Sequence, residues 1–261
     1  MSEQASDPDI IKFENVRVSF AGELVYDDLS MSVREGEFIC ILGPSGCGKS
    51  TSLRLMGDLL KTSGGRITVA GRQPADAWRE LAYVFQSPRL APWRDALNNV
   101  VLAMELRFGN MPKTAMRKRA TELLELVGLA ADAHKYPSML SGGERQRVSI
   151  ARALAVDPRI VLMDEPFSAL DLNTRRRLRL EMVDIWQKTG KTIVFVTHDI
   201  EEALTLADRI ILLSNKPTRV LQSITIIEER PRSLDDAPEL RRHRDHLHAL
   251  FAELETVPAQ T

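Results

Sequence analysis

The nine residues GPSGCGKST at positions 43–51 combine three glycines with a lysine and two adjacent hydroxyl side chains. They follow the pattern G-x-x-x-x-G-K-[ST], whose glycines let successive backbone N–H groups point at a phosphate chain. Lys49 adds a positive charge near the β and γ phosphates, and the Ser50 hydroxyl is placed to ligate Mg²⁺. The stretch therefore predicts a site for a nucleoside triphosphate. Its expected binding residues are Gly43, Pro44, Ser45, Gly46, Cys47, Gly48, Lys49, Ser50 and Thr51.

Two apolar runs further along the chain end in residues that can act on a bound triphosphate. The run 160–164 ends in Asp164 and is followed by Glu165. An aspartate there can hold the water shell of Mg²⁺, and the next carboxylate can orient or deprotonate an attacking water. His198 follows the run 192–197, where one donor can stabilise charge that builds up on the γ-phosphate. Taken alone, each of these ends also fits an ordinary polar turn after a strand.

A second glycine-rich helix start lies at LSGGERQR, residues 140–147. Its backbone N–H groups and helix dipole make another anion site, although it has no lysine. Read by itself, the segment is a capped helix. Two phosphate-binding helix starts in one chain suggest a shared ligand.

The phosphate-binding stretch needs a strand before it and a helix after it, and the sequence predicts these at 38–42 and 52–60. Runs rich in β-branched residues at 11–20 and 26–33 predict an antiparallel flap. Further strands are predicted at 64–71, 81–86, 160–164, 192–197 and 209–214, and helices at 93–107, 114–127, 143–156, 173–188 and 200–206. The continuous apolar strands after residue 159 are typical of a parallel sheet that is buried on both faces.

The helical stretch 88–157 interrupts this alternation and predicts an inserted α-helical subdomain. We therefore expect an α/β domain over 10–230, whose core is formed by 10–87 and 158–230. Residues 1–9 are expected to be disordered. A short helical tail is predicted for 231–261, with a helix cap at 233–236 and Leu240, Leu247, Leu250 and Phe251 on one side.

The composition narrows the possible functions. The chain has 261 residues, 44% of them hydrophobic, and a formal net charge of -1. This is enough for a substantial core, and the near-zero charge argues against binding to nucleic acid. The acidic, polar start predicts no secretory signal, and no apolar run is long enough to predict a membrane span. Cys40 and Cys47 suggest a reducing cytosol, and we expect Cys47 beside Lys49 to favour the thiolate.

The order of the motifs resembles the nucleotide-binding subunit of ABC transporters over almost the whole chain, from about Ile10 to Ser214. The resemblance rests on GPSGCGKST, Gln86 after a strand, LSGGERQR, IVLMDEP, SALD at 168–171, and His198. It implies a phosphate-loop NTPase fold, which combines a RecA-like parallel core, an antiparallel β flap and the inserted helical subdomain. It also implies ATP and Mg²⁺ as cofactors, with hydrolysis of ATP driving transport.

The resemblance implies a role for each matching residue. Phe20 corresponds to the aromatic residue that stacks on adenine. The catalytic residues of the family correspond to Glu165, His198 and Gln86. Its magnesium ligands correspond to Ser50, Gln86 and Asp164. The signature that closes over ATP held by the other subunit corresponds to Ser141, Gly142, Gly143 and Glu144, and the D-loop to Asp171. Glu144 stands where glutamine is commonest, so we expect its carboxylate to point away from the phosphate.

The family resemblance also implies partners. Two ATPase subunits, either two copies or this chain and a relative, would sandwich ATP and form a dimer. They would bind transmembrane permease subunits at the cytoplasmic, inner face of the membrane, and an extracytoplasmic solute-binding protein would act indirectly. Residues 86–100 and the tail from Pro231 are similar to importers of nitrate, sulfonate and taurine, although shared packing explains the Pro92 and Trp93 pair equally well.

Three other interpretations stay open. The chain also fits the ATPase of an ABC exporter, or a soluble ABC ATPase that acts on nucleic acid or ribosomes. Soluble ABC ATPases of that kind typically carry two cassettes or a long coiled-coil insert, and the sequence shows neither. A phosphate-loop kinase for a small molecule is the third, but it leaves residues 141–143 without a task.

Overall fold

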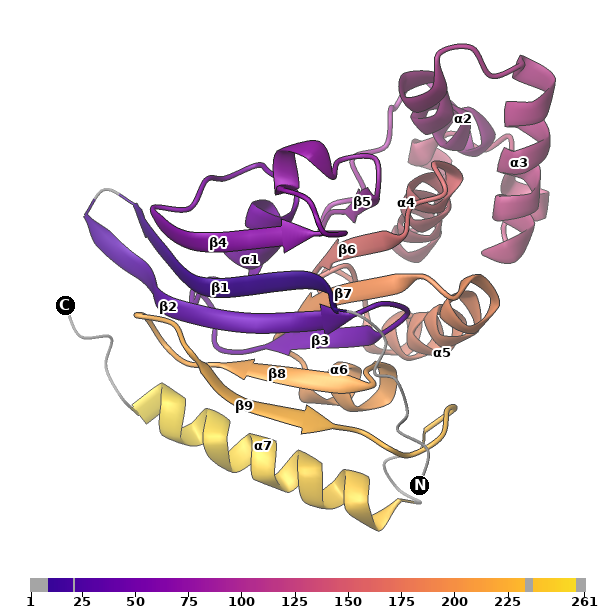
Figure 1. The fold of residues 1–261 in the computed structure, drawn as a ribbon. Coiled ribbons are helices and arrows are strands. Elements are labelled where there is room, and N and C mark those ends of the chain that lie inside the picture. Colours follow the sequence, from indigo (N-terminus) through magenta and orange to yellow (C-terminus); the bar gives the residue numbers. More distant parts are fainter. Residues whose placement is uncertain (1–8, 21, 233–236, 257–261) are drawn as a thin grey trace, which may run out of the picture. The chain divides into compact units, whose positions relative to one another are not determined.

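The chain forms two compact units in a computed structural model, which describes residues 9–20, 22–232 and 237–256 (Figure 1). Unit 1 comprises Met1–Glu80 and Lys191–Thr261, and unit 2 comprises Leu81–Gly190. The disorder predicted for 1–9 concerns residues that lie outside the described part, except that Asp9 already opens the first strand. The helical stretch predicted at 88–157 falls within unit 2.

An antiparallel three-stranded sheet forms part of unit 1. Its strands are β1 (Asp9–Phe20), β2 (Glu23–Arg34) and β4 (Gly64–Val69), in the order β2-β1-β4. Successive side chains of a strand point to opposite faces. Ile11 and Phe13 are buried on this alternation, and beyond the register shift between Phe13 and Val16 the buried residues are Val16 and Val18. The predicted antiparallel flap is confirmed.

A second sheet in unit 1 is arranged around β3 (Phe38–Leu42). Strands β7 (Thr192–Thr197) and β8 (Arg209–Leu213) pair with β3 in parallel, and β9 (Val220–Thr225) pairs with β8 in the antiparallel direction. All residues of β3 and β7 are buried, as expected for strands covered on both faces. β9 escapes prediction from the sequence because exposed and half-buried residues alternate along it and no continuous apolar run marks it.

Short helices follow the strands of unit 1. α1 (Lys49–Met56) follows the phosphate-binding stretch, α6 (Ile200–Leu206) follows β7, and a 3-10 turn, η1 (Pro74–Asp76), follows β4. α1 begins and ends earlier than the predicted 52–60, because Gly48 is its N-cap and the helix stops at Gly57.

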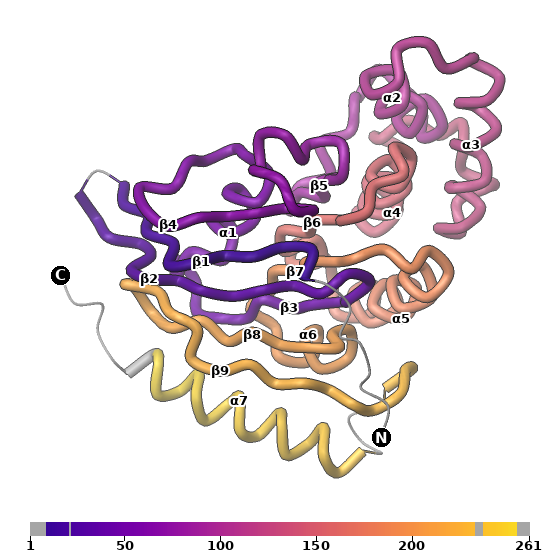
Figure 2. Tube along the Cα trace, viewed as in Figure 1, coloured from indigo at the N-terminus to yellow at the C-terminus, as the bar shows by residue number. Residues whose placement is uncertain are grey.

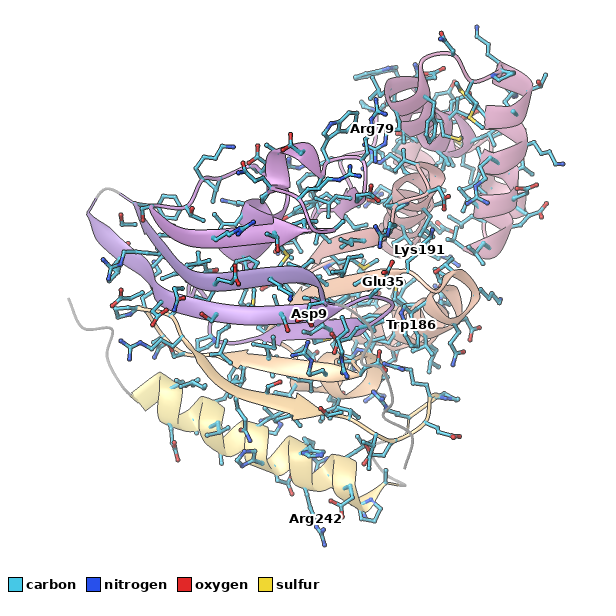
Figure 3. All side chains as sticks on the ribbon, in the orientation of Figure 1. Asp9, Glu35, Arg79, Trp186, Lys191 and Arg242 are labelled. Atoms are coloured by element: carbon cyan, nitrogen blue, oxygen red, sulfur yellow. The ribbon has the colours of Figure 1, made fainter. Side chains whose placement is uncertain are left out.

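The last helix, α7 (Pro238–Thr256), packs on α6 and runs along the outer side of β9 (Figures 1 and 2). In α7, the Nε2 atom of His246 lies 2.8 Å from Oε1 of Gln222 in β9. The Arg242 side chain, which is 76% exposed, extends from α7 away from the sheet (Figure 3). Of the four apolar residues predicted to share one side of this helix, Leu240 and Leu247 are fully buried, whereas Leu250 and Phe251 are half-buried. The helix cap predicted at 233–236 lies outside the described residues.

Unit 2 contains a parallel strand pair and four helices. The strands are β5 (Leu81–Val84) and β6 (Ile160–Asp164). The helices are α2 (Ala96–Phe108), α3 (Lys113–Leu126), α4 (Gly142–Ala155) and α5 (Leu172–Thr189), with 3-10 turns η2 (Ala130–Asp132) and η3 (Pro137–Met139) between α3 and α4. α2 packs on both α3 and α4.

The buried side chain of Asn99 in α2 holds the segment before that helix. Its amide oxygen accepts a hydrogen bond from the N–H of Ala91 at 2.7 Å, and its amide nitrogen donates to the carbonyls of Ala91, Arg94 and Asp95 at 2.9–3.1 Å. A buried amide needs such partners. The motif around residues 91–99 therefore has a packing role that is independent of any transported solute.

Candidate functional site

The phosphate-binding loop connects β3 to α1 and uses its glycines in two different ways. Gly46 and Gly48 have φ angles of 78° and 110°, which side chains disfavour. Gly43 does not need a positive φ. A Cβ atom there would lie 3.1 Å from the carbonyl oxygen of Leu213 and 3.0 Å from Sγ of Cys47, so close packing favours glycine.

Lys49 lies inside this loop. Its side chain is 5% exposed, and Nζ donates to the carbonyl oxygens of Gly43 and Pro44 at 2.8 Å each. The positive charge is thus fixed at the start of α1, where the helix dipole also favours an anion. Gly48 is the N-cap and offers no side-chain acceptor to the first N–H groups of α1, which are the groups that phosphates bind at such helix starts.

Cys47 differs from the sequence-based expectation. Its side chain is 2% exposed, and burial raises the pKa of the thiol more than the nearby charge of Lys49 lowers it. The predicted thiolate is therefore wrong. Local spacing places a cation beside Cys47, but tertiary packing removes the water that the thiolate needs.

We predict slow alkylation of Cys47 in the folded protein. Because its pKa is raised, the thiolate fraction at about pH 7.5 is smaller than that of a free cysteine and grows only as the pH rises. Iodoacetamide labelling, followed by mass spectrometry of the peptide, should give rapid modification in urea and little in buffer. Rapid labelling of folded protein at neutral pH would contradict the buried thiol.

Phe20 and His198 both belong to unit 1. The Phe20 ring, at the end of β1, is 40% exposed and therefore accessible to a stacking partner. His198 is exposed directly after β7. The backbone around His198 is stabilised by two hydrogen bonds of Thr197. Its Oγ1 donates to a carboxylate oxygen of Glu202 at 2.6 Å and accepts from the N–H of Asp199 at 3.0 Å. His198 is thus a side chain at the surface on a fixed backbone.

The two acidic residues at the end of β6, Asp164 and Glu165, lie in unit 2. The hydroxyl of Tyr83 is 3.4 Å from Oδ2 of Asp164. Glu165 has a φ of 42°, a left-handed conformation that is costly for a side chain and clusters at functional sites. The Gln86 amide donates to the Ser168 hydroxyl at 2.9 Å, and this hydroxyl donates to the Glu165 carbonyl at 3.0 Å. Gln86 and the segment of Glu165 are therefore linked by hydrogen bonds.

The helix start at 141–144 forms a capping box. The carboxylate of Glu144 accepts a hydrogen bond from the N–H of Ser141 at 2.6 Å, and Ser141 Oγ accepts from the N–H of Glu144 at 3.3 Å. The hydrogen bond from the Ser141 backbone lowers the pKa of Glu144. The Glu144 carboxylate thus bonds back to the backbone of the helix start, because Ser at the N-cap and Glu three residues later satisfy each other. That it points away from a bound phosphate stays a prediction.

Gly143 and Asp171 both meet the first turn of α5. A Cβ atom on Gly143 would lie 2.6 Å from Cγ2 of Thr174, so only glycine allows α4 and α5 to approach this closely. Asp171 is the N-cap of α5 and accepts a hydrogen bond from the N–H of Thr174 at 3.0 Å. Both residues therefore have a structural role within unit 2, in addition to the role implied by the family resemblance.

The expected magnesium ligands match the chemistry of the ion. Ser50 offers a hydroxyl from the first turn of α1 in unit 1, whereas Gln86 and Asp164 offer an amide oxygen and a carboxylate in unit 2. Mg²⁺ in nucleotide sites usually takes one or two protein oxygens, together with phosphate and water. Over residues 9–20, 22–232 and 237–256, no three His, Cys, Asp or Glu side chains form a metal cluster.

Residues 26–168, more than half of the chain, match the family described as ABC transporter. The chain belongs to the ABC transporter family. A solved dimeric ATP-binding cassette in a post-hydrolysis state with ADP and Pi has the same fold, with a TM-score of 0.72 and 35% identity over 84% of this chain and 100% of that one. The phosphate-loop NTPase fold is confirmed, and this ABC protein is a transport ATPase that binds and hydrolyses ATP.

Several curated relatives of this ABC protein are named as import ATP-binding proteins. It is 40% identical to the taurine import ATP-binding protein TauB of Yersinia pestis bv. Antiqua, over 91% of this chain and 96% of that protein. The nitrate import ATP-binding protein NrtD of Synechococcus elongatus is 39% identical, over 83% of this chain and 80% of NrtD. The Fe(3+) ions import ATP-binding protein FbpC of Rhizobium etli is 43% identical, over 88% of this chain and 64% of FbpC.

No helix of this ABC protein within the described ranges is both long enough and apolar enough to cross a membrane.

Two residues that contact the phosphate-binding loop were not predicted from the sequence. They are Tyr26 and Thr218, whose hydroxyls donate to carbonyls of the loop. Tyr26 lies in a predicted strand and Thr218 in a stretch for which no element is predicted, so neither position signals this contact.

Proposed function

We propose that this ABC protein is the ATP-binding subunit of an importer for a small anionic solute of the nitrate, sulfonate or taurine type. The observation that carries the proposal is the 40% identity to a taurine import ATPase over 96% of that protein's length. The similarity to a nitrate import ATPase supports the same solute class. An Fe(3+) importer is the second candidate, which the 43% identity to FbpC favours.

The ATP site that we propose is built first by unit 1. Phe20 stacks on the adenine ring, which is a contact that aromatic side chains make without a polar group. The loop 43–51 surrounds the phosphates with N–H groups, and Lys49 neutralises charge on the β and γ phosphates. Ser50, with Gln86 and Asp164, holds Mg²⁺, which neutralises the phosphate oxygens when it is bound.

Hydrolysis, in our proposal, uses three polar side chains around the terminal phosphate. Glu165 orients the attacking water and accepts its proton, and its left-handed backbone sets the direction in which the side chain leaves the chain. His198 donates a hydrogen bond to the oxygen on which negative charge grows. Gln86 couples nucleotide binding at the site to the membrane subunits. Its hydrogen bond to Ser168 connects it to the segment of Glu165.

Two ATPase subunits share each site in this proposal. The helix start of Ser141, Gly142, Gly143 and Glu144 in one subunit binds the γ-phosphate of ATP that the loop of the other subunit holds, and Asp171 lies at the junction. ATP thus bridges the two subunits, whereas ADP lacks the phosphate that the second subunit binds. Because the two nucleotides differ in affinity for the closed pair, hydrolysis reopens the pair. The dimeric cassette that shares this fold supports the arrangement.

The remaining partners follow from the same proposal. Permease subunits cross the membrane and bind this ABC protein at the cytoplasmic face, and a solute-binding protein outside delivers the cargo. Nothing in the composition favours nucleic acid as a partner, because the net charge is -1.

The proposed function is tested by reconstitution. The complex that copurifies with this ABC protein from its own membranes is placed in liposomes with its solute-binding protein. We expect ATP hydrolysis to rise when that protein carries taurine or nitrate and to stay unchanged with Fe(3+). Stimulation by Fe(3+) alone would replace the proposed solute class with the second candidate. Purification without any membrane subunit would contradict the importer itself.

A further inference from the structure

We infer that the hydroxyls of Tyr26 and Thr218, here called the hydroxyl clamp, position the phosphate-binding loop for ATP. The inference rests on the phosphate-loop site proposed above. It assigns both residues as positioning residues, because they act on phosphate through the backbone of the loop and not by direct contact.

The hydroxyl clamp donates to two consecutive carbonyls. The Tyr26 hydroxyl donates to the carbonyl oxygen of Gly48 at 2.5 Å, and the Thr218 hydroxyl donates to that of Cys47. Both clamp side chains are fully buried. The two carbonyls belong to the peptide planes on either side of the Gly48 α-carbon, so each plane receives one hydroxyl.

The orientation of these planes decides where the N–H groups of the loop point. In a trans peptide the N–H lies opposite the carbonyl of the preceding residue. A hydroxyl on the Cys47 carbonyl therefore directs the N–H of Gly48 to the other side, and a hydroxyl on the Gly48 carbonyl does the same for Lys49. Those N–H groups belong to the set that the loop offers to phosphate.

The backbone conformation at Gly48, which connects the two peptide planes, needs stabilisation by residues outside the loop. Gly48 has a φ of 110°, and glycine moves between conformations more easily than any other residue. The Gly48 carbonyl also accepts from the N–H groups of Thr51 and Ser52 at 2.8 and 3.2 Å, so the helix already holds one plane. The Cys47 plane precedes the helix, and Thr218 is the side chain that holds it. Of the two clamp members we therefore expect Thr218 to have the larger effect.

The clamp residues are themselves tied together. The N–H of Thr218 donates to the carbonyl of Val25 at 2.7 Å, and Tyr26 and Thr218 form a parallel β-bridge. A Cβ atom on Gly48 would lie 2.8 Å from Cε1 of Tyr26, so the ring occupies the space beside this residue. Two segments outside the loop thus fix the backbone at Gly48: strand β2, which carries Tyr26, and the connection between β8 and β9, which carries Thr218.

A purely structural role is the alternative, because any buried hydroxyl needs a hydrogen-bond partner. The two roles differ in what a deletion changes. A structural hydroxyl affects the stability of the fold, whereas a positioning hydroxyl also affects the affinity for the phosphates of a nucleotide. The test therefore measures nucleotide affinity and thermal unfolding on the same variants.

The test variants are Tyr26→Phe and Thr218→Val, which remove one hydroxyl each and keep the shape of the side chain. We expect the Kd and KM for MgATP to rise about three- to tenfold in each variant, the range that one lost hydrogen bond produces. The kcat at saturating ATP should stay within about twofold, because the loss concerns binding. Thr218→Ser keeps the hydroxyl and should restore the affinity.

Thr192→Val is the matched control. Thr192 is equally buried, and its hydroxyl accepts from the N–H of Gly36 at 2.9 Å at a position outside the loop. We expect this variant to lose thermal stability as the clamp variants do and to keep the MgATP affinity. A clamp variant that loses stability with unchanged Kd and KM, as the control does, would overturn the inference.

The Lys49→Ala variant separates this outcome from a failure of the proposed site. If Lys49→Ala binds MgATP normally, the phosphate-loop assignment is wrong and the clamp has no site to position. If Lys49→Ala loses affinity but both clamp variants keep it, the site stands and the clamp alone is wrong. In ¹⁵N spectra we expect the Gly48 and Lys49 amide signals to shift in the clamp variants before nucleotide is added, and unchanged signals would count against positioning.

Discussion

The Lys49→Ala variant should lose ATP binding and hydrolysis together. Lys49 is buried at 5% exposure, and its ammonium group is held between the carbonyls of Gly43 and Pro44. Deleting a charged hydrogen-bonding group in such a place weakens binding by about 10- to 100-fold. Removing one donor from developing charge slows the chemical step by a further 10²–10³-fold, as an order of magnitude. A fluorescent ATP analogue and a phosphate-release assay measure the two effects.

The control for this variant is Lys61→Ala. Lys61 also lies in unit 1, but its side chain is 75% exposed and pairs with Asp58 at 2.6 Å. We expect its ATPase rate to be unchanged, because exposed ion pairs contribute little. Circular dichroism of both variants checks that they fold. Normal turnover by folded Lys49→Ala would remove the assignment of the loop 43–51 as the ATP site.

The Glu165→Gln variant should bind ATP but hydrolyse it slowly. Glutamine keeps the size of the side chain and cannot accept the proton of water, and a general base typically contributes about 10²–10⁴-fold to the rate. ATP then persists in the closed pair, so a dimer should accumulate on a sizing column with MgATP. With MgADP the same variant should elute as a monomer, since ADP lacks the bridging phosphate.

Glu122→Gln, an exposed carboxylate on α3 of the same unit, is the matched control for charge removal. We expect it to hydrolyse ATP at the normal rate and to form no lasting dimer. A Glu165→Gln protein that turns over ATP normally would exclude Glu165 as the base. If that variant is slow yet monomeric with MgATP, the shared site is contradicted while the catalytic role is kept.

Local patterns predicted the parts of the site that depend on neighbouring residues. The turn at Gly46 and Gly48 needs positive φ angles, which only glycine adopts easily, so the residue types reveal the backbone. The capped helix at Ser141 and the strand ending at Asp164 are also local features, and the structure has them where the sequence predicts them. Phe20 is exposed, as a stacking residue must be.

Features that depend on tertiary packing could not be predicted. The pKa of Cys47 is raised by burial, which spacing along the chain does not show. Tyr26 reaches Gly48 across 22 positions, and nothing in a β-strand pattern distinguishes a tyrosine that supports a loop from one that fills a core. Gly143 reads as a ligand-binding glycine, whereas its approach to Thr174 of α5 becomes visible only in the fold. The clamp and the helix contact therefore depend on residues that only the folded chain brings together.

The claim that one ATP is held by two subunits is tested most directly by mixing two variants that each have a different half of the ATP site inactivated. Lys49→Ala and Ser141→Arg are each introduced into Glu165→Gln, and the two double variants are studied alone and together with MgATP. Since each alone has only defective sites, neither should dimerise. Mixed, they can form one intact site from Lys49 of one chain and Ser141 of the other. The account predicts a dimer that holds one ATP per two chains, and absence of any dimer in the mixture, when Glu165→Gln alone dimerises, would contradict it.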